Sequence, residues 1–161
     1  MIYYSYQETP MGMILLTRED EVLTGLHWKV FRRTPQPAAG WEENEAVFAD
    51  ILRQLDEYYR GKRQVFDAKF AARGTKFQMD VWRELEKIPF GQSSSYQAIA
   101  TAIGKPNAVR AVGTAIGSNP LSILVPCHRV LTSDGKLGGY AGGLPAKQTL
   151  LQTEGIEIKK F

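Results

Sequence analysis

The chain opens with short runs of aliphatic, aromatic and β-branched residues that are separated by polar, turn-forming residues. The runs lie at residues 2–6, 13–17 and 22–28, and the interruptions are the turn-like residues 9–12 and the charged residues 18–21. Runs of this length and composition, bounded in this way, are typical of β-strands. The pattern predicts three short strands joined as an antiparallel meander.

A helical period replaces the strand pattern between residues 41 and 59. Gly61 follows as a plausible stop, and the preceding residues 31–40 contain two prolines and read as a loop. The apolar positions that recur at helical spacing are Val47, Phe48, Ile51, Leu52, Leu55 and Tyr58. We expect this helix to pack on the sheet and to complete a small α/β domain.

After Gly74 the pattern changes to helices joined by short polar turns. Thr75 is a candidate N-cap for a helix that breaks at residues 89–91, Pro-Phe-Gly. The apolar stripe of this helix is Phe77, Val81, Trp82, Leu85 and Ile88. The change at Gly74 predicts two domains, residues 1–74 and residues 75–161.

The stretch SSSYQAIATAIGKPNAVRAVGTAIGSNP predicts two further helices around a glycine turn. Ser94 or Ser95 can cap a helix through Ile103, and Asn107 can cap a second helix that runs toward Gly117. This arrangement is a helix-turn-helix, and a packed helical hairpin without DNA explains it equally well. The second helix is rich in small residues, with Arg110 as its one long polar side chain. If DNA is the partner, such a helix suits the minor groove better than the base-reading role of a major-groove helix.

The charge of the chain is uneven. Residues 1–74 carry 10 Lys and Arg against 11 Asp and Glu, whereas residues 75–161 carry 10 against 6, a balance of +4. The hydrophobic fraction of 43% and the charged fraction of 23% are those of an ordinary globular protein. The basic second half is a weak indication of a polyanionic partner.

The chain has one cysteine and two distant histidines, His27 and His128. These residues cannot form an internal disulfide, and they do not supply the usual ligands of a tetrahedral zinc site, so no metal is expected. The first residues lack the pattern of a signal peptide, and no stretch approaches the roughly 18 apolar residues of a membrane span. We expect a cytoplasmic protein with no membrane contact.

The segment VPCHRV places Cys127 next to His128 in apolar surroundings. A reactive thiol beside its base and a buried structural cysteine are equally compatible with this spacing. Adjacent side chains of an extended segment point to opposite faces, so a bridging water would be needed to carry a proton from sulfur to imidazole. Glu154, after a helix predicted at residues 145–153, is either a solvated acid or the carboxylate that orients His128.

Four stretches closely resemble the O6-alkylguanine-DNA alkyltransferases, the methylated-DNA–protein-cysteine methyltransferases. They are FQMDVWRELEKIPFG, SYQAIATAIGKPNAVRAVG, NPLSILVPCHRV and GGYAGG with the closing LLQTEG, and they run in the family order from about residue 75 to residue 155. The resemblance implies an α/β N-terminal domain related to ribonuclease H, followed by an all-α, winged-helix-like domain with a helix-turn-helix. It also implies direct repair of O6-alkylguanine in double-stranded DNA, by transfer of the alkyl group to the protein in a single turnover.

Through this resemblance, individual residues acquire expected roles. Cys127 is similar to the alkyl acceptor, with His128 as its water-mediated base and Glu154 as the acid that orients His128. Tyr96 resembles the tyrosine that helps to rotate the target nucleotide, and Arg110 the finger that fills the vacated stack. The helix face with Ala108, Gly113 and Thr114 is expected against the minor groove. Asn119 matches the residue that links the helix-turn-helix to the reactive turn, while Val130, Tyr140 and Ala141 are expected around the flipped base.

The chain departs from the family pattern at a few positions, and other functions are compatible with parts of the sequence. Ala141 stands where several members have serine, and Ile116 and Gly117 replace longer residues, so we expect one phosphate contact to be missing. No cofactor is implied, the protein is expected to be a monomer, and O4-alkylthymine is a second candidate lesion. Rival functions are a non-transferring binder of alkylated DNA, in which the acceptor cysteine is replaced, a helix-turn-helix regulator and a cysteine hydrolase.

Overall fold

The computed structural model of the protein describes residues 1–29 and 34–158. The first domain contains strands β1 (Ile2–Thr9), β2 (Gly12–Glu19) and β3 (Val22–Trp28), the short strand β4 (Glu42–Glu43), a 3₁₀ turn (Ala46–Phe48) and helix α1 (Ala49–Tyr59). Residues 31–33 of the predicted loop lie outside the described residues, and residues 34–40 contain no helix or strand.

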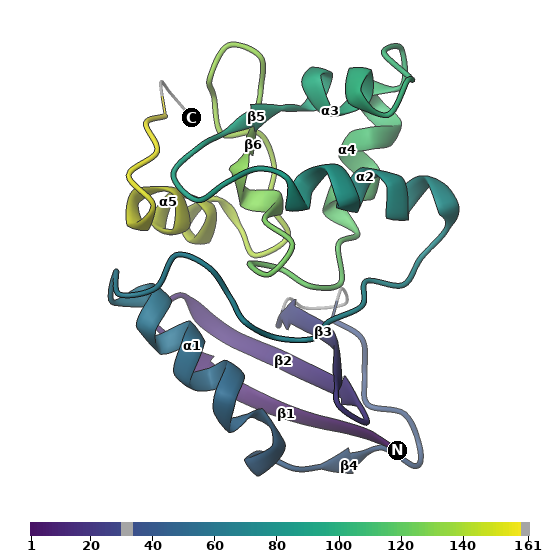
Figure 1. Ribbon diagram of the computed structural model, residues 1–161, viewed down its shortest axis with the longest axis vertical. Helices are drawn as coiled ribbons and strands as arrows, with labels where there is room; N and C mark the ends of the chain where they lie inside the picture. The colour runs from purple at the N-terminus through teal and green to yellow at the C-terminus, as the bar shows by residue number, and fades with distance from the viewer. Residues whose placement is uncertain (30–33, 159–161) are drawn as a thin grey trace.

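The predicted meander is confirmed. The sheet has the order β3-β2-β1-β4, and β1 and β2 are antiparallel in a register that pairs Ile2 with Glu19 and Thr9 with Gly12. Strand β4 pairs parallel to β1, so the sheet is mixed rather than wholly antiparallel. Helix α1 lies across one face of this sheet (Figure 1), and its buried residues Ile51, Leu55 and Tyr58 share a core with Ile14 and Leu16 of β2. The helix starts later than its apolar period suggested, because a 3₁₀ turn precedes it.

The second domain contains helices α2 (Lys76–Glu86), α3 (Tyr96–Ala102), α4 (Val109–Gly117) and α5 (Leu144–Thr153). A 3₁₀ turn covers Cys127–Arg129, and the two-residue strands β5 (Ser94–Ser95) and β6 (Val130–Leu131) pair in parallel. The domain is therefore helical except for one short ladder. None of the helices within residues 1–29 and 34–158 is long and apolar enough to cross a membrane.

Two of the three predicted helix caps are confirmed. Thr75 forms a capping box with Gln78, and the Ser95 hydroxyl accepts from the Ala98 backbone N–H at 3.0 Å. The Asn107 cap is wrong, since the N-cap of α4 is Ala108. The reason is a turn in which the Ala108 N–H donates to the carbonyl of Lys105 at 2.9 Å, which places Asn107 inside the turn.

The two domains share one core and a backbone connection. Residues from α1, the sheet, α2 and α4 belong to a single buried cluster. At the outer edge of β3, the Leu26 N–H donates to Pro120 at 2.8 Å, and the Ser122 N–H donates to Leu26 at 3.1 Å. The edge of the first domain's sheet thereby holds the segment that leads from α4 to Cys127.

Candidate functional site

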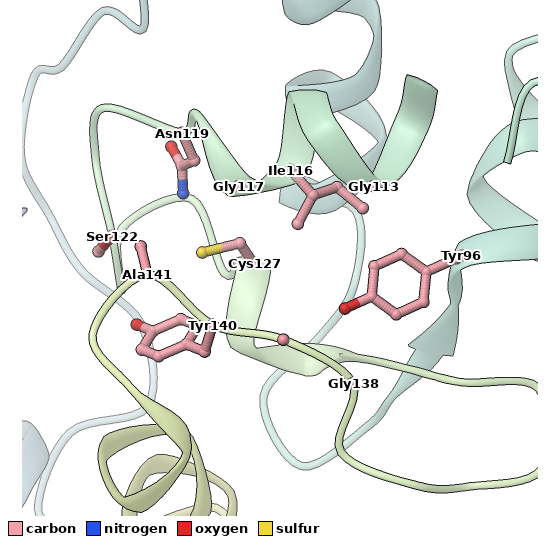
Figure 2. Close-up of a pocket in the computed structure, with 11 residues that line it drawn as sticks. Tyr96, Gly113, Ile116, Gly117, Asn119, Ser122, Cys127, Gly138, Tyr140 and Ala141 are labelled. Carbon is pink, nitrogen blue, oxygen red and sulfur yellow. The ribbon is translucent and has the colours of Figure 1, made fainter. Parts of the chain in front are cut away.

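Cys127 borders a cavity of about 440 Å³ at which α3, α4 and two loops meet. Figure 2 shows its sulfur and the Tyr96 ring in the same hollow, with Asn119 above and Tyr140 below in this view. The lining residues are Tyr96, Gly113, Ile116, Gly117, Asn119, Ser122, Cys127, Gly138, Gly139, Tyr140 and Ala141. Seven of the residues that the sequence singled out as functional, or as departures from the family pattern, therefore line this cavity together with the thiol: Tyr96, Gly113, Ile116, Gly117, Asn119, Tyr140 and Ala141.

A strained turn presents the thiol. Ile123 has a φ of 72°, a left-handed conformation that is unfavourable for a β-branched residue. Asn119 spans this turn, because its Nδ2 donates to the carbonyl of Val125 at 2.8 Å and its Oδ1 accepts from the Leu121 N–H at 3.0 Å. The side chain of Asn119 thus offsets strain that the backbone would otherwise release.

The backbone at the thiol is a 3₁₀ turn, not the extended segment assumed from the sequence. Cys127 is 5% exposed and His128 is fully buried. No hydrogen bond joins the two side chains in the described part of the chain, and His128 Nδ1 is buried without a hydrogen-bond partner. Nδ1 is therefore the ring nitrogen of His128 that is left to accept a hydrogen bond or a proton.

Glu154 lies directly behind His128, with its Oε2 at 2.6 Å from His128 Nε2. The same carboxylate accepts from Arg129 Nε at 2.7 Å, from Arg129 Nη2 at 3.1 Å and from the Gly91 N–H at 3.2 Å. The Tyr58 hydroxyl, which comes from α1 of the first domain, donates to Oε2 at 2.6 Å. Glu154 is therefore the centre of a buried network and not a solvated acid.

The network sets the charges of its members. Burial opposes ionisation of Glu154, but hydrogen bonds from His128, Arg129 and Tyr58 outweigh it and lower the pKa of the carboxyl to about 2. Burial lowers the pKa of His128 more than the neighbouring carboxylate raises it, so the imidazole is neutral at neutral pH. A neutral imidazole that holds its proton on Nε2, toward Glu154, keeps Nδ1 as an acceptor.

Burial also controls the thiol. It raises the pKa of Cys127, while a hydrogen bond from Asn119 and the charge of Lys147 oppose the rise. Burial likewise raises the pKa of Tyr96, which keeps its hydroxyl proton at neutral pH. The resting site contains a neutral thiol, a neutral imidazole and a neutral phenol.

The glycine-rich loop packs against the rings of Tyr96 and Trp28. Gly138, at a φ of +68°, lies so close to Tyr96 that a Cβ there would approach its hydroxyl to 2.8 Å. A Cβ on Gly142 would approach the Trp28 indole to 2.8 Å. Trp28 Nε1 also donates to the Tyr140 hydroxyl at 2.9 Å. The loop needs these glycines because backbone and rings are in contact.

The helix residues expected at DNA divide between two surfaces. Ala108, Arg110 and Thr114 border a shallow groove of about 690 Å³ between the starts of α2 and α4, whereas Gly113 faces the cavity. Arg110 and Thr114 are exposed, and no ion pair involves Arg110 among the described residues. The exposed face of α4 thus presents one free guanidinium among small side chains.

Val130 lies behind the cavity and not in its lining. It is fully buried on β6, and its carbonyl accepts from Lys147 Nζ at 2.7 Å. In the part of the chain that the structure describes, no group of three or more His, Cys, Asp or Glu side chains could hold a metal ion.

Sequence reasoning missed Tyr58, Arg129, Lys147 and Trp28. Arg129 directly follows the Cys-His pair, and Lys147 occupies the buried face of α5 with Ala146, Leu150 and Leu151. A lysine at a position where the helical period predicts an apolar residue could have marked Lys147 as unusual. Tyr58 and Trp28 gave no such signal, since aromatic residues in an apolar stripe are ordinary core residues.

Comparisons with known proteins cover both halves of the chain. The family described as "6-O-methylguanine DNA methyltransferase, DNA binding domain" matches residues 76–156, and "6-O-methylguanine DNA methyltransferase, ribonuclease-like domain" matches residues 2–72. A methylated-DNA–protein-cysteine methyltransferase of Methanosarcina barkeri is 46% identical over 153 residues, which cover 95% of this chain and 97% of the relative. Its counterpart in Mycolicibacterium paratuberculosis is 47% identical over 155 residues, which cover 96% of this chain and 93% of the relative.

Solved structures agree with the sequence relatives. The crystal structure of Mycobacterium tuberculosis OGT in complex with DNA has a TM-score of 0.87 and 41% identity, and the match covers 94% of this chain and 92% of that one. The ribonuclease-like first domain and the helical second domain are thus those of this group. The chain belongs to the methylated-DNA–protein-cysteine methyltransferase family.

Proposed function

We propose that the protein repairs O6-alkylguanine in double-stranded DNA by moving the alkyl group to Sγ of Cys127, once per molecule. One observation carries the proposal: the sole cysteine of the chain borders a cavity, with a His128–Glu154 pair buried directly behind it. The name of the relatives and the DNA complex of the mycobacterial OGT support DNA as the partner.

The lesion must leave the duplex before the thiol can reach it. Rotating a nucleotide out of the stack costs a few kcal/mol, which contacts in the extrahelical state must offset. We assign Arg110 to the vacated stack, because it is the one long exposed side chain on the small-residue face of α4. Ala108, Gly113 and Thr114 let this helix approach the minor groove closely.

The transfer balances without a cofactor. The thiol proton passes through water to His128 Nδ1, while Glu154 fixes the proton on Nε2. The Cys127 sulfur then forms a bond to the alkyl carbon as the bond from that carbon to O6 breaks. The leaving guanine takes a proton from the Tyr96 hydroxyl. His128 then returns a proton to Tyr96 through the site water, so the proton lost by the thiol finally resides on the guanine.

The cavity also supplies the contacts that recognise the base. Tyr140 and Ala141 line it directly, and we assign their backbone groups to the base, because alanine keeps the same N–H donor as serine. Asn119 joins this pocket to α4 through the turn that it spans. Since Val130 lies behind the lining, we assign it the support of the pocket wall and not a contact with the base.

The division of labour between the domains belongs to the same proposal. Residues 75–161 bind DNA and accept the alkyl group, and residues 1–74 form the scaffold behind them. A monomer suffices, because every side chain assigned above comes from one chain. The cytoplasmic location expected from the sequence and the acceptance of O4-alkylthymine stay predictions.

The test is the intact mass of the protein after incubation with duplex DNA containing O6-methylguanine. We expect one added methyl group on Cys127 and a plateau near one repaired lesion per protein when lesion is in excess. Cys127→Ala should bind lesion DNA without any transfer. Binding by the unaltered protein without a mass increase would indicate a non-transferring binder, and continued turnover would contradict the single-use mechanism.

A further inference from the structure

Lys147 is a buried cation without a carboxylate partner. Its side chain has no exposed surface, and no Asp or Glu oxygen lies within the 4.0 Å of an ion pair in the described residues. Isolated buried charges are costly and are normally paired with an opposite charge. Apolar packing alone therefore does not explain why a charged lysine occupies this buried position.

The ammonium of Lys147 has only neutral hydrogen-bond partners. It donates to the carbonyl of Val130 at 2.7 Å, to that of Gly139 at 3.1 Å and to that of Leu137. Val130 follows the 3₁₀ turn that carries Cys127, and the other two carbonyls belong to the loop that closes the cavity. One side chain thus ties the thiol's turn to the cavity's loop.

Three ionisable groups of the described residues interact with the Lys147 charge. Tyr96 on α3 lies against it, with its ring centroid 5.9 Å from Nζ, and the charge acts on Cys127 and His128 of the 3₁₀ turn. The Lys147 charge lowers the pKa of the thiol and also lowers the pKa of His128, so it favours an anion on sulfur and disfavours a cation on the imidazole. Cys127 is thus the group whose ionisation this cation would promote.

We propose that the Lys147 ammonium is the preorganised counter-charge of the Cys127 thiolate, and that it couples the charge on this sulfur to the loop at residues 137–139. The inference rests on the proposed function, in which Cys127 reacts as a thiolate. A charge fixed in advance at the position where a negative charge develops lowers the cost of forming it. Lys147 acts through Cys127 and is a positioning residue.

The coupling is reciprocal. Burial lowers the pKa of Lys147 to about 8, and a thiolate on Cys127 raises it. The ammonium therefore keeps its charge at neutral pH and is strengthened when the thiol ionises. Alkylation turns the sulfur into a thioether that cannot ionise, so no thiolate can raise the pKa of Lys147, and the ammonium that holds the three carbonyls loses its proton at lower pH.

The test is the rate of Cys127 labelling by iodoacetamide across a range of pH, read by intact mass. Because the chain has one cysteine, the label reports this thiol alone. Lys147→Gln removes the charge but keeps a donor, Lys147→Arg keeps the charge, and Lys136→Gln removes an exposed lysine charge from the neighbouring loop. Among residues 1–29 and 34–158, Lys136 pairs only with Asp134, at 3.4 Å on the surface.

We expect the midpoint of the Lys147→Gln profile to move to higher pH, with labelling about tenfold slower below the midpoint and an unchanged rate at the alkaline plateau. Lys147→Arg should stay near the unaltered protein, and Lys136→Gln should coincide with it. A Lys147→Gln profile with an unchanged midpoint, or one lowered equally at every pH, would overturn the proposal, because a merely structural role gives those results.

A second measurement needs no variant and covers the case in which Lys147→Gln does not fold. The Nζ resonance of Lys147 is titrated by ¹⁵N NMR before and after Cys127 is labelled, and we expect the labelled protein to lose the proton at lower pH. Equal midpoints would overturn the inference. If the unaltered protein took no methyl group from O6-methylguanine DNA while these shifts were observed, the proposed function would fail and the counter-charge would stand.

Discussion

A single buried carboxylate organises the polar side chains next to Cys127. Glu154 receives contacts from five polar atoms, namely the hydroxyl of Tyr58, one ring nitrogen of His128, two guanidinium nitrogens of Arg129 and the N–H of Gly91. Arg129 is 8% exposed and also donates to the carbonyl of Ile88 at 2.6 Å. Its position is stable only while Glu154 is ionised, so the carboxylate that we propose to orient His128 also neutralises a buried cation.

Glu154→Gln should therefore impair both stability and transfer. Removing one partner of a buried ion pair typically costs about 3–5 kcal/mol, because the other charge stays buried and unpaired. Loss of the fixed His128 tautomer should slow single-turnover transfer by about 100-fold. Urea unfolding and quenched-flow repair kinetics measure the two effects. Glu157→Gln, an exposed acid three residues away, is the control, and an equally slow Glu157→Gln protein would contradict this assignment.

Several helices and strands that position the site are held by contacts between residues far apart in the sequence, and a local sequence pattern cannot reveal such contacts. The α2 cap and the meander were predictable, because a cap and a strand period lie within neighbouring residues. Strands β4, β5 and β6 have two residues each, which is too short to show a period, and their pairing partners are remote in sequence. Tyr58 and Glu154 are 96 positions apart, so their hydrogen bond was invisible to sequence reasoning.

The motifs identified residues that the structure brings together around Cys127, but they did not reveal the geometry of that site. The sequence placed Cys127 and His128 in an extended segment, whereas a 3₁₀ turn follows the left-handed Ile123. This turn depends on hydrogen bonds to a side chain six residues away from Val125, that of Asn119. Backbone strain that is offset by tertiary contacts leaves no trace in hydrophobic periodicity.

Asn119→Ala should loosen the turn between α4 and the thiol. Two hydrogen bonds are lost beside a strained residue, and a buried donor or acceptor left unpaired typically costs about 1–3 kcal/mol. The thiol also loses the hydrogen bond that lowers its pKa, so iodoacetamide labelling at neutral pH should slow. Thermal unfolding and labelling are the measurements, with Asn44→Ala in the first domain as control. Labelling that stays as fast as in the unaltered protein would show that Asn119 does not act on the sulfur.

Arg110→Ala should separate DNA handling from chemistry. The variant removes the only long side chain from the exposed face of α4 and leaves the cavity lining intact. We expect repair of duplex DNA to slow by at least about tenfold, as the cost of rotating the nucleotide is no longer offset. The reaction with free O6-benzylguanine should be unchanged. Arg60→Ala, an exposed arginine paired with Asp56 in the first domain, is the control. Equal loss with the free base and with duplex DNA would refute this division of roles.

Contacts between the two domains end at the candidate site, so the scaffold domain acts directly on residues around Cys127. Tyr58 of α1 reaches Glu154, Trp28 of β3 reaches Tyr140, and Leu26 pairs with the segment between Asn119 and the thiol. Tyr58 is fully buried, and burial together with the charge of Glu154 raises the pKa of its hydroxyl, which stays protonated and donating. Three contacts across the domain boundary thus end on residues of the site.

Tyr58→Phe should weaken the connection between the domains while preserving the packing of the ring. A hydrogen bond to a charged group contributes about 1.5–3 kcal/mol, so unfolding by urea should require correspondingly less denaturant. Tyr59→Phe, which removes a hydroxyl that makes no hydrogen bond to Glu154 in the described residues, should have a smaller effect. If the two variants had equal stability, the hydroxyl of Tyr58 would not contribute through Glu154.

The dependence of stability on acid should identify Glu154 as a buried contributor. Its pKa is about 2 in the folded protein against a usual value of 4.5, so its ionisation stabilises the fold fully above pH 4.5. This contribution is lost progressively as the pH falls from 4.5 to about 2, because the unfolded chain takes up the proton first. Glu19, Asp50, Asp80 and Asp134 also have lowered pKa values, but they lie at the surface, where salt screens their pairs. Unfolding free energies measured against pH in high salt should therefore fall steeply in this window for the unaltered protein and less for Glu154→Gln. Parallel curves for the two proteins would show that Glu154 is not held ionised by the network that surrounds it.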